Sequence, residues 1–264
     1  MPNTGDFGLS SAAQQIKQHY PNSAVYTLTD LHDAEFLAWC ELQQLPSELQ
    51  GSAIKRQQEF LAGRYCAARA LQQLGQPELD MLGRQPNGQP AWPAVYSGSI
   101  THHRGRAVAW VAPSTHYREL GLDLEGVVSL ARAQQLQPRV LNPTEIQLGE
   151  RLGYPPALWF SLLFSCKETV YKLLSHAAGR YMPFSSVEII ALGQDVTASM
   201  LRLTCQLTED WSVDWPCAAQ VSVSALLLTD PPLLEPQSAN QKPAPATHVL
   251  SYAALAASTP QQDH

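Results

Sequence analysis

Apolar residues recur at helical spacing in two long stretches of the chain. From Ser47 to about Leu74 they fall on one face of a helix, and Gly75-Gln76-Pro77 ends the pattern. A second helical pattern runs from about Ala157 to Ala177. The sequence therefore predicts two long helices, of which the first is amphipathic.

The pattern elsewhere is mostly that of strands. Residues 97–112 predict a hairpin with His103-Arg104-Gly105-Arg106 at the turn, and residues 121–125 predict the next strand. Helices are expected around residue 131 and over 143–150, and strands near 187–192, 200–208 and 218–228. Because a helix followed by strands occurs twice, the order favours an α+β architecture with two halves.

Charged residues interrupt two of these hydrophobic segments. Asp123 and Glu125 are two positions apart in a predicted strand, so both side chains project from one face. Glu168 and Lys172 are four apart in the second long helix and share its narrow polar stripe, which also contains serines 161, 165 and 175. If the stripe meets the strand, three carboxylates could hold a hard cation such as Mg²⁺, and Lys172 would lie beside phosphates bound to it.

Simpler explanations exist for each of these features. An Asp-x-Glu pair at a strand end is often only solvated, and a Glu/Lys pair four residues apart is often a surface ion pair. Neither feature alone therefore identifies a site.

Composition and charge narrow the class of protein. Of 264 residues, 45% are hydrophobic and 15% charged, which predicts a globular protein with a substantial core. No stretch reaches the 18 or more apolar residues of a membrane span, and the N-terminal segment lacks the features of a signal peptide, so we expect a cytoplasmic protein. The five cysteines are scattered and show no Cys-x-x-Cys spacing, which predicts reduced, mostly buried thiols.

The net charge of −6 argues against a general nucleic-acid-binding protein, which needs an excess of Lys and Arg. One local basic cluster remains in the first long helix, where Lys55, Arg56, Arg64 and Arg69 accompany a single acid, Glu59. Guanidinium groups bind phosphate in bidentate fashion, so this cluster is a candidate phosphate site. A solvated basic helix face is the alternative for any one of these residues.

The amino-acid composition changes over residues 231–264. Residues 231–264 contain six prolines and only three charged residues, which predicts a flexible tail. Residues 248–255 interrupt it and could form a short helix or strand that docks on the body. We therefore expect an N-terminal half over 1–115, a C-terminal half over 116–230 and a tail over 231–264.

The two charged motifs together resemble a known family. Gly121-x-Asp123-x-Glu125, followed by Phe164-Ser165-x-Lys167-Glu168-x-x-x-Lys172, is similar to the signature pair of the 4′-phosphopantetheinyl transferases of the Sfp-like branch. The segments 88–93 and 98–103 resemble further elements of the family, and the basic helix 55–64 resembles that of its enterobactin-synthetase component D type. These matches cover roughly residues 52 to 190.

The resemblance implies a fold of two pseudo-symmetric halves and an Mg²⁺-dependent enzyme. In the family, the 4′-phosphopantetheine group of coenzyme A is moved to a serine of an acyl, peptidyl or aryl carrier protein. The implied partners are coenzyme A and such carriers, with siderophore peptide synthesis as the favoured pathway. We expect a monomer that binds neither nucleic acid nor membrane.

The resemblance also implies roles for individual residues. The metal ligands would be Asp123, Glu125 and Glu168, with Glu168 also the candidate general base. Lys172 would bind and steady the phosphates. The coenzyme A contacts would come from a further set, which is Arg56, Arg64, Thr101 and His102. Glu145 matches a family glutamate, although an acid in the first turn of a helix also has a structural explanation.

Two other functions stay open at this point. The same carboxylates could serve an Mg²⁺-dependent phosphoester hydrolase that uses water as its nucleophile. The chain could also be a non-catalytic module that holds coenzyme A or a carrier. The joint presence of the lysine-bearing helix and the basic helix favours the transferase over both.

Overall fold

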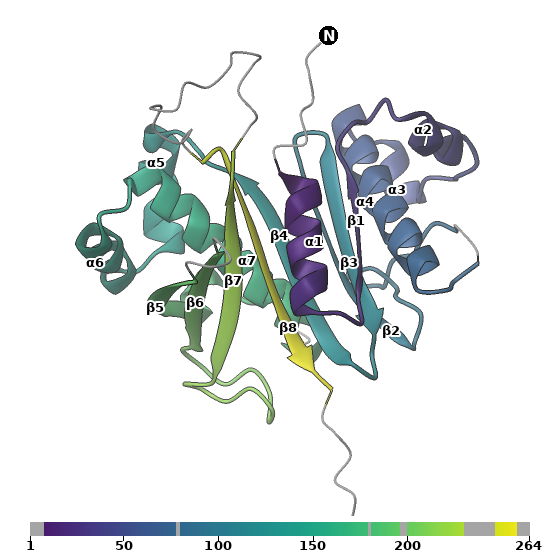
Figure 1. Cartoon of the computed structure of the whole chain (residues 1–264). Helices are drawn as coiled ribbons and strands as arrows, with labels where there is room; N and C mark the ends of the chain where they lie inside the picture. The colour runs from purple at the N-terminus through teal and green to yellow at the C-terminus, as the bar shows by residue number, and fades with distance from the viewer. Residues whose placement is uncertain (1–7, 78–79, 179–180, 196–199, 230–245, 258–264) are drawn as a thin grey trace, which may run out of the picture. The chain divides into compact units, whose positions relative to one another are not determined.

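The computed structural model describes residues 8–77, 80–178, 181–195, 200–229 and 246–257 (Figure 1). The chain divides into two compact units. The N-terminal unit comprises the described residues within Gln14–Gly121 and Ala254–His264, and the C-terminal unit those within Met1–Ala13 and Leu122–Ala253. Helix α1 (Leu9–His19) and strands β4 (Tyr117–Gly126) and β8 (His248–Ala256) each contribute residues to both units.

The N-terminal unit contains a three-stranded antiparallel sheet in the order β1-β3-β2. Its strands are β1 (Ala24–Leu28), β2 (Tyr96–His103) and β3 (Arg106–Pro113). The predicted hairpin is confirmed, and its two-residue turn has positive φ at Arg104 (46°) and Gly105 (79°), the geometry that matches strand twist.

Helix α4 (Ile54–Gln73) packs against this sheet (Figure 1). Tyr65, Cys66 and Ala70 of the helix share a core with Ala107 and Val111 of β3. The helix approaches β2 closely, since a Cβ added at Gly63 would lie 2.7 Å from Cγ2 of Ile100. Helix α2 (Ala34–Glu41) adds Phe36 and Trp39 to the core.

The prediction of one continuous helix from residue 47 is wrong at its start. The structure forms a short helix α3 (Ser47–Gln50), then a break at residues 51–53, and α4 begins at Ile54. Gly51 lies at the break, where its backbone freedom disfavours helix. Ile54, which belongs to the apolar pattern of the predicted helix, is the first residue of α4 and is 72% exposed.

The C-terminal unit contains a five-stranded sheet in the order β4-β8-β7-β6-β5. Its remaining strands are β5 (Val187–Asp195), β6 (Met200–Leu207) and β7 (Gln220–Leu228), and β5 to β8 pair antiparallel. Helices α5 (Leu130–Val140), α6 (Pro143–Leu152) and α7 (Pro156–Ala178) accompany it, with a 3-10 turn η1 (Phe184–Ser186) before β5. The fold class α+β is confirmed, and the similarity of the two halves stays a prediction.

The assignment of residues 231–264 to a flexible tail is wrong for its central part. Residues 248–256 form β8, an interior strand between β4 and β7, and six consecutive side chains from His248 to Ala253 are buried. The alternative of a short strand is confirmed there. Residues 230–245 and 258–264, which the tail prediction also covers, lie outside the described residues.

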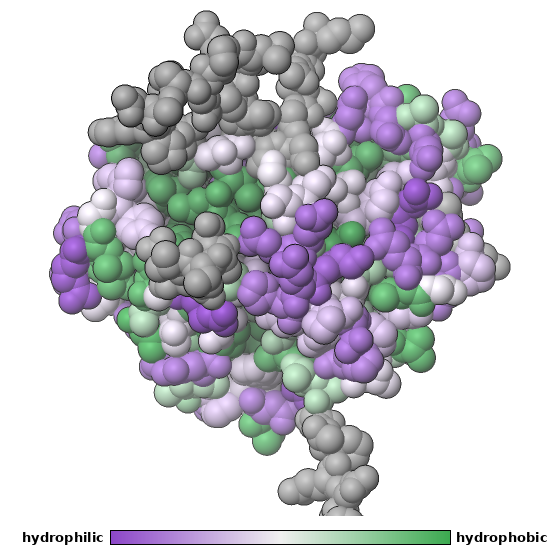
Figure 2. Space-filling model, viewed as in Figure 1, coloured by the Kyte–Doolittle hydropathy of each residue, from purple (hydrophilic) through white to green (hydrophobic). Residues whose placement is uncertain are grey.

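Polar residues are frequent on the surface, and apolar residues form the core. Polar residues cover much of the face shown in Figure 2, and hydrophobic residues form smaller patches among them. All five cysteines are free, and Cys66, Cys166 and Cys205 are buried, as predicted. Among the described helices, none has the length and hydrophobicity that crossing a bilayer requires.

Candidate functional site

Strand β4 and helix α7 bring the predicted strand carboxylate and helix lysine together. The Nζ of Lys172 lies 2.7 Å from Oδ1 of Asp123 and donates a second hydrogen bond to the carbonyl of Leu122 at 3.0 Å. The Asp123 side chain is 5% exposed and that of Lys172 is 26% exposed. The predicted meeting of the polar stripe with the strand face is thus confirmed at its lysine end.

The serines of the stripe extend this contact along α7. Ser161 Oγ accepts a hydrogen bond from the backbone N–H of Val128 at 3.1 Å, directly after β4. Ser165 Oγ shares a hydrogen bond of 2.7 Å with the hydroxyl of Ser251 in β8. Thr169 donates to or accepts from the same Ser251 hydroxyl at 2.7 Å. Helix α7 is therefore fixed to the strand beside β4 by buried hydroxyl groups.

The three predicted metal ligands influence one another electrostatically. Burial raises the pKa of Asp123, which the neighbouring Lys172 partly offsets and Glu125 raises further. Burial also raises the pKa of Glu168, and the charges of Asp123 and Glu125 add to that rise. The fold thus places three like charges within range of each other, an arrangement that disfavours their common ionisation unless a cation is present.

The carboxylate oxygens of this cluster suit a divalent cation, although the side chains are not arranged as a complete coordination shell. Among the described residues, no three acidic, histidine or cysteine side chains are arranged as a metal-binding group. Lys172 serves as the counter-ion of Asp123 Oδ1, whereas Oδ2 of Asp123 is buried and has no hydrogen-bond partner in the described part of the chain. A buried carboxylate oxygen without a partner is costly, and oxygen atoms of this kind are the ligands that Mg²⁺ prefers.

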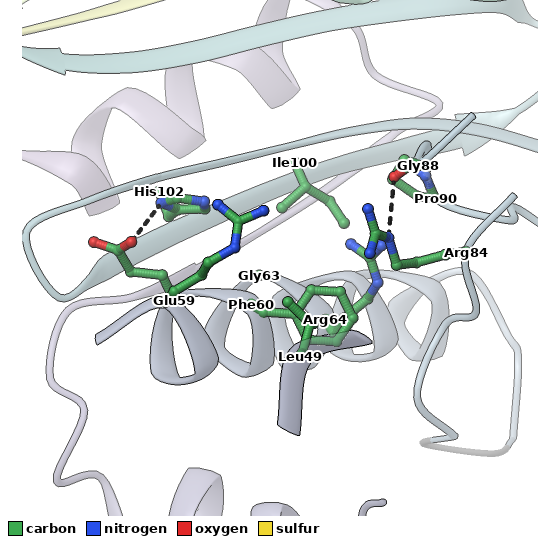
Figure 3. Close-up of a pocket in the computed structure, with 11 residues that line it drawn as sticks. Leu49, Glu59, Phe60, Gly63, Arg64, Arg84, Gly88, Pro90, Ile100 and His102 are labelled. Atoms are coloured by element: carbon green, nitrogen blue, oxygen red, sulfur yellow. Dashed lines mark hydrogen bonds and ion pairs between the residues drawn. The ribbon is translucent and has the colours of Figure 1, made fainter. Parts of the chain in front are cut away.

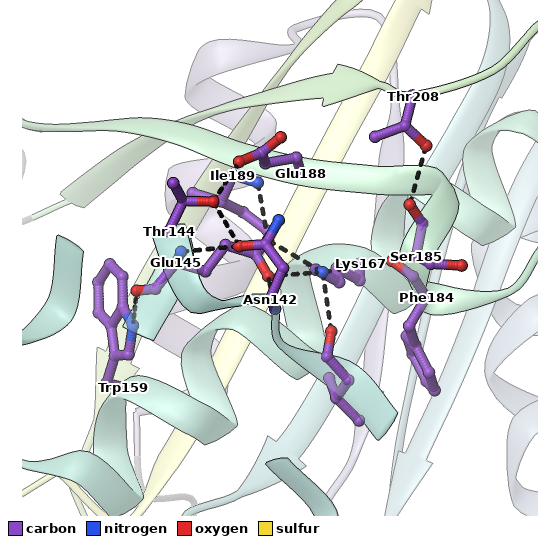
Figure 4. A network of polar contacts seen from close by, with 11 residues as sticks. Asn142, Thr144, Glu145, Trp159, Lys167, Phe184, Ser185, Glu188, Ile189 and Thr208 are labelled. Carbon is purple, nitrogen blue, oxygen red and sulfur yellow. Dashed lines mark hydrogen bonds and ion pairs between the residues drawn. The ribbon is translucent and has the colours of Figure 1, made fainter. Parts of the chain in front are cut away.

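Lys167 and Glu145 form a buried ion pair that the sequence patterns did not predict (Figure 4). Their Nζ and Oε1 atoms are 2.9 Å apart, and the two side chains are 2% and 0% exposed. Lys167 also donates to the carbonyls of Val140 (2.8 Å) and Phe184 (3.2 Å). Glu145 accepts from the N–H of Ile189 at 2.8 Å, so the pair connects α7, α6 and β5.

The structural explanation of Glu145 as a first-turn acid is confirmed. Its carboxylate accepts from the N–H of Asn142 at 2.9 Å while the Asn142 side chain accepts from the N–H of Glu145, which completes a capping box at the start of α6. One signal for Lys167 was available in the sequence. A lysine between the buried positions Cys166 and Val170 must find an acidic partner, and Glu145 is that partner.

A small cavity of about 90 Å³ opens beside Glu168. Tyr171, Tyr181, Met182 and Phe184 supply most of its apolar and aromatic wall. Lys167 is the one basic residue in the lining, so the cavity suits an uncharged chain better than an anion. A chain bound there would lie beside the carboxylate of Glu168.

The N-terminal unit contains a basic pocket of about 250 Å³ between α4, β2 and the segment 84–90 (Figure 3). It brings together Arg56, Arg64 and His102, as predicted, and adds Arg84. Glu59 is its single acidic lining residue, and this carboxylate lies 3.8 Å from both Lys55 Nζ and His102 Nδ1. The pocket is positive and suits a phosphate group.

Thr101 is not part of this pocket. Side chains alternate between the two faces of a strand, so Ile100 and His102 line the pocket while Thr101 between them faces the other side of β2 and is 3% exposed. The predicted contact of Thr101 with coenzyme A is not supported by this placement.

Arg84 is the pocket residue that the sequence patterns did not reveal. It lies outside every helix and strand, in the turn between residues 83 and 91, where no periodic pattern marks it. Its side chain donates to the carbonyl of Gly88 at 3.4 Å and pairs with Glu48 at 3.2 Å. The only available signal was its position four residues before Gly88 in a segment that matches the family.

Comparison with known proteins identifies the family that the two charged motifs resemble. Residues 45–112 match the family model described as the 4′-phosphopantetheinyl transferase N-terminal domain, and residues 119–219 match that of the 4′-phosphopantetheinyl transferase superfamily. Among the similar proteins is "Enterobactin synthase component D" of Salmonella typhi, 34% identical over 48% of this chain and 52% of the relative. The protein of that name in Escherichia coli K12 is 34% identical over 54% of this chain and 69% of its own length.

A relative with a different name matches over a similar span. The "4′-phosphopantetheinyl transferase Npt" of Nocardia iowensis is 32% identical over 60% of this chain and 72% of its own length. The matched region of this chain thus spans about half of the first relative and about two thirds or more of the other two.

Proposed function

The chain belongs to the 4′-phosphopantetheinyl transferase superfamily, and we propose that it transfers the 4′-phosphopantetheine group of coenzyme A to a serine of an apo carrier protein. The observation that carries this proposal is the pairing of Lys172 with the buried Asp123 at 2.7 Å, one helical turn from Glu168. A cluster of carboxylates with a lysine cation is what a diphosphate-binding centre requires.

Asp123, Glu125 and Glu168 are the residues that would hold Mg²⁺. When bound, Mg²⁺ supplies Lewis-acid stabilisation of the charge on a diphosphate. Lys172 reaches the same place from α7 and is a quarter exposed, so its ammonium group can turn from Asp123 to a phosphate oxygen. The lysine would thereby hold the leaving phosphate.

In the proposed reaction, one bond to phosphorus forms while another breaks, and a side chain takes up the released proton. The serine hydroxyl oxygen of the carrier forms a bond to the phosphorus that carries pantetheine, and the diphosphate bond to the adenosine side breaks. The leaving group is adenosine 3′,5′-bisphosphate. Glu168 would accept the serine proton, because its carboxylate is influenced by those of Asp123 and Glu125 and borders the open cavity beside Tyr171.

The basic pocket of the N-terminal unit, with Arg56, Arg64 and His102, suits the phosphate groups of coenzyme A. The small apolar cavity beside Glu168 suits an uncharged chain. Relatives named enterobactin synthase component D favour carriers of siderophore peptide synthesis. The free thiols suit a reducing compartment, and we place the reaction in the cytoplasm.

Mass spectrometry tests this proposal directly. The protein is incubated with coenzyme A, MgCl₂ and a panel of apo carriers, and the expected result is a gain of about 340 Da on at least one carrier, the mass of the transferred phosphopantetheine group. Omitting Mg²⁺ or adding EDTA should prevent the gain. Cleavage of coenzyme A without any modified carrier would instead identify a hydrolase, and binding of coenzyme A without turnover would identify a non-catalytic module.

A further inference from the structure

Three buried hydroxyl groups connect helix α7 to strand β8. Ser251 of β8 lies at their centre, with its Oγ 2.7 Å from the hydroxyl oxygens of both Ser165 and Thr169. All three residues are 0% exposed, and Thr169 is also within hydrogen-bond distance of the carbonyl of Ser251, at 3.2 Å. Because Ser165 and Thr169 are four residues apart, the hydroxyl of Ser251 spans one turn of the helix.

This turn of α7 belongs to the reaction centre. Ser165 Oγ lies 3.5 Å from the carbonyl oxygen of Asp123, so one side chain of α7 reaches both β8 and the adjacent strand β4 (Figure 1). Glu168 lies within the same turn, and Lys172, one turn further along, pairs with Asp123 at 2.7 Å. The contact made by Ser251 is thus next to the residues that would hold the cation and the phosphates.

Hydrogen bonds constrain the rotation of α7 more specifically than its apolar contacts do. The neighbouring apolar residues of the helix include Cys166, Val170 and Leu173, all 0% exposed. Burial of such side chains is favourable but non-directional, whereas hydrogen bonds require particular distances and angles. Buried hydroxyl groups cost free energy unless they are paired, and a fully paired group of them specifies one arrangement. The hydroxyl cluster therefore selects one rotation of the helix.

Strand β8 lies outside the two regions that match the family models, residues 45–112 and 119–219. The likeness to known transferases therefore assigns no role to Ser251. Val249, Ser251 and Ala253 alternate onto one face of the strand, and all three are buried. Ser251 thus places a hydroxyl between two apolar side chains, at the point where β8 meets α7.

We propose that Ser251 is a positioning residue of the reaction centre, whose hydroxyl fixes the rotation of α7 and so keeps Glu168 and Lys172 aligned with Asp123. This rests on the proposed function in taking those three residues to bind Mg²⁺ and phosphate. Without the hydroxyl, its two partners on α7 lose a common anchor, and the helix can settle differently against β4 and β8. The carboxylates would then be less well arranged around a cation, while the basic pocket of the N-terminal unit keeps its contacts.

Magnesium dependence of the Ser251→Ala variant tests this inference. The MgCl₂ requirement is measured from the rise in melting temperature in the presence of coenzyme A, and separately from the rate of carrier modification. We expect the requirement to increase about 3- to 10-fold, the scale of one lost hydrogen bond. The kcat should fall while KM for coenzyme A changes less than about twofold. A wild-type MgCl₂ requirement in Ser251→Ala overturns the assignment.

Val249→Ala provides a matched control on the same face of β8. Val249 is 0% exposed, so its truncation weakens the packing of this strand but leaves the three hydroxyl groups in place. The variant should have a lower melting temperature, with kcat and MgCl₂ requirement close to those of the wild type. An increase in MgCl₂ requirement as large as that of Ser251→Ala would indicate a general loosening of β8 and would overturn the role of the hydroxyl.

Ser251→Cys covers the case in which the alanine variant does not fold. It nearly keeps the size of the side chain, but a thiol is a weak donor and acceptor, so a smaller increase in MgCl₂ requirement is expected. No increase at all would again overturn the assignment.

Melting and transfer together distinguish this inference from the proposed function. A wild-type protein that is stabilised by MgCl₂ but modifies no carrier refutes only the transferase. A wild-type protein that modifies carriers, with Ser251→Ala requiring no more MgCl₂ than the wild type, refutes only the role of Ser251.

Discussion

Lys172 and Asp123 form an ion pair across the contact between α7 and β4, in which only one carboxylate oxygen is used. Oδ1 accepts the lysine at 2.7 Å, and Oδ2 is buried without a hydrogen-bond partner among the described residues. The lysine therefore provides a partner for one of the two carboxylate oxygens. A cation bound at Oδ2 would provide a partner for the other oxygen, and it would compete with Lys172 for the negative charge of Asp123.

Replacing Lys172 with Gln should make the stability of the protein more dependent on Mg²⁺. Without Mg²⁺, the buried carboxylate loses its partner, and we expect unfolding to become easier by about 1–3 kcal/mol, less than for a fully buried pair because Lys172 is partly exposed. Thermal denaturation with and without MgCl₂ measures this. The rise in melting temperature on adding MgCl₂ should be larger for Lys172→Gln than for the wild type; an equal rise would mean that Lys172 and the metal do not share Asp123.

Replacing Glu168 with Gln should remove transfer while preserving the fold. Glutamine has the same shape but cannot accept the serine proton and is a weaker ligand for Mg²⁺, so a loss of at least about 100-fold in rate is expected. Carrier modification followed by mass spectrometry gives the rate. The exposed Glu150 on α6 is the control, and Glu150→Gln should retain full activity. Near-normal transfer by Glu168→Gln with unchanged Mg²⁺ requirement would contradict both roles given to Glu168.

The contact between β4 and α7 could be predicted because both elements have strong local patterns. Residues two apart in a strand and four apart in a helix define faces without any tertiary information, so the sequence predicted which side chains would meet if the two elements packed together. The structure shows that Lys172 and Asp123 do meet. Arg84 could not be found in this way. It lies in an irregular turn, and only the fold shows that it shares a pocket with Arg64.

The interior place of β8 in the five-stranded sheet was not predicted, for a different physical reason. Its neighbours in sequence are rich in proline and poor in charge, which dominated the composition of residues 231–264. Its place in the sheet depends on pairing with β7 across a long stretch of chain, as in the register of Tyr252 opposite Ser224. Nonlocal pairing of this kind leaves no periodic signal beyond the strand itself.

The buried pair Lys167–Glu145 should be strongly cooperative. Removing either partner alone leaves a charge in the core, and each of Lys167→Met and Glu145→Leu is expected to destabilise the protein by about 3–5 kcal/mol. The double variant should lose clearly less than the sum of the two, since no uncompensated charge remains. Urea denaturation of the four proteins gives this coupling energy. Additive losses would show that the two side chains stabilise the fold through their separate backbone contacts.

Thiol labelling should separate the five cysteines by exposure. Cys217 is exposed, whereas burial raises the pKa of Cys66, Cys166 and Cys205, the last to about 12, and that of the half-buried Cys40 to about 11. Because the thiolate is the reacting species, maleimide at about pH 7.5 should add rapidly to Cys217 alone in the folded protein and to all five in denaturant. Intact-mass analysis counts the adducts. Rapid native labelling of Cys166 would contradict the packing of α7 on its sheet.

The hydroxyl of Ser251 should contribute to the placement of α7 through two side chains at once. Ser165 and Thr169 each lie 2.7 Å from its Oγ, all three residues are fully buried, and Ser251→Ala would leave both partners short of a hydrogen bond. A loss of about 1–3 kcal/mol in unfolding free energy is expected, compared with little change for Ser222→Ala on the exposed side of β7. Because Ser165 and Thr169 flank Glu168 in the helix, transfer should also weaken in Ser251→Ala. Full stability in Ser251→Ala would show that this network does not hold the helix to β8.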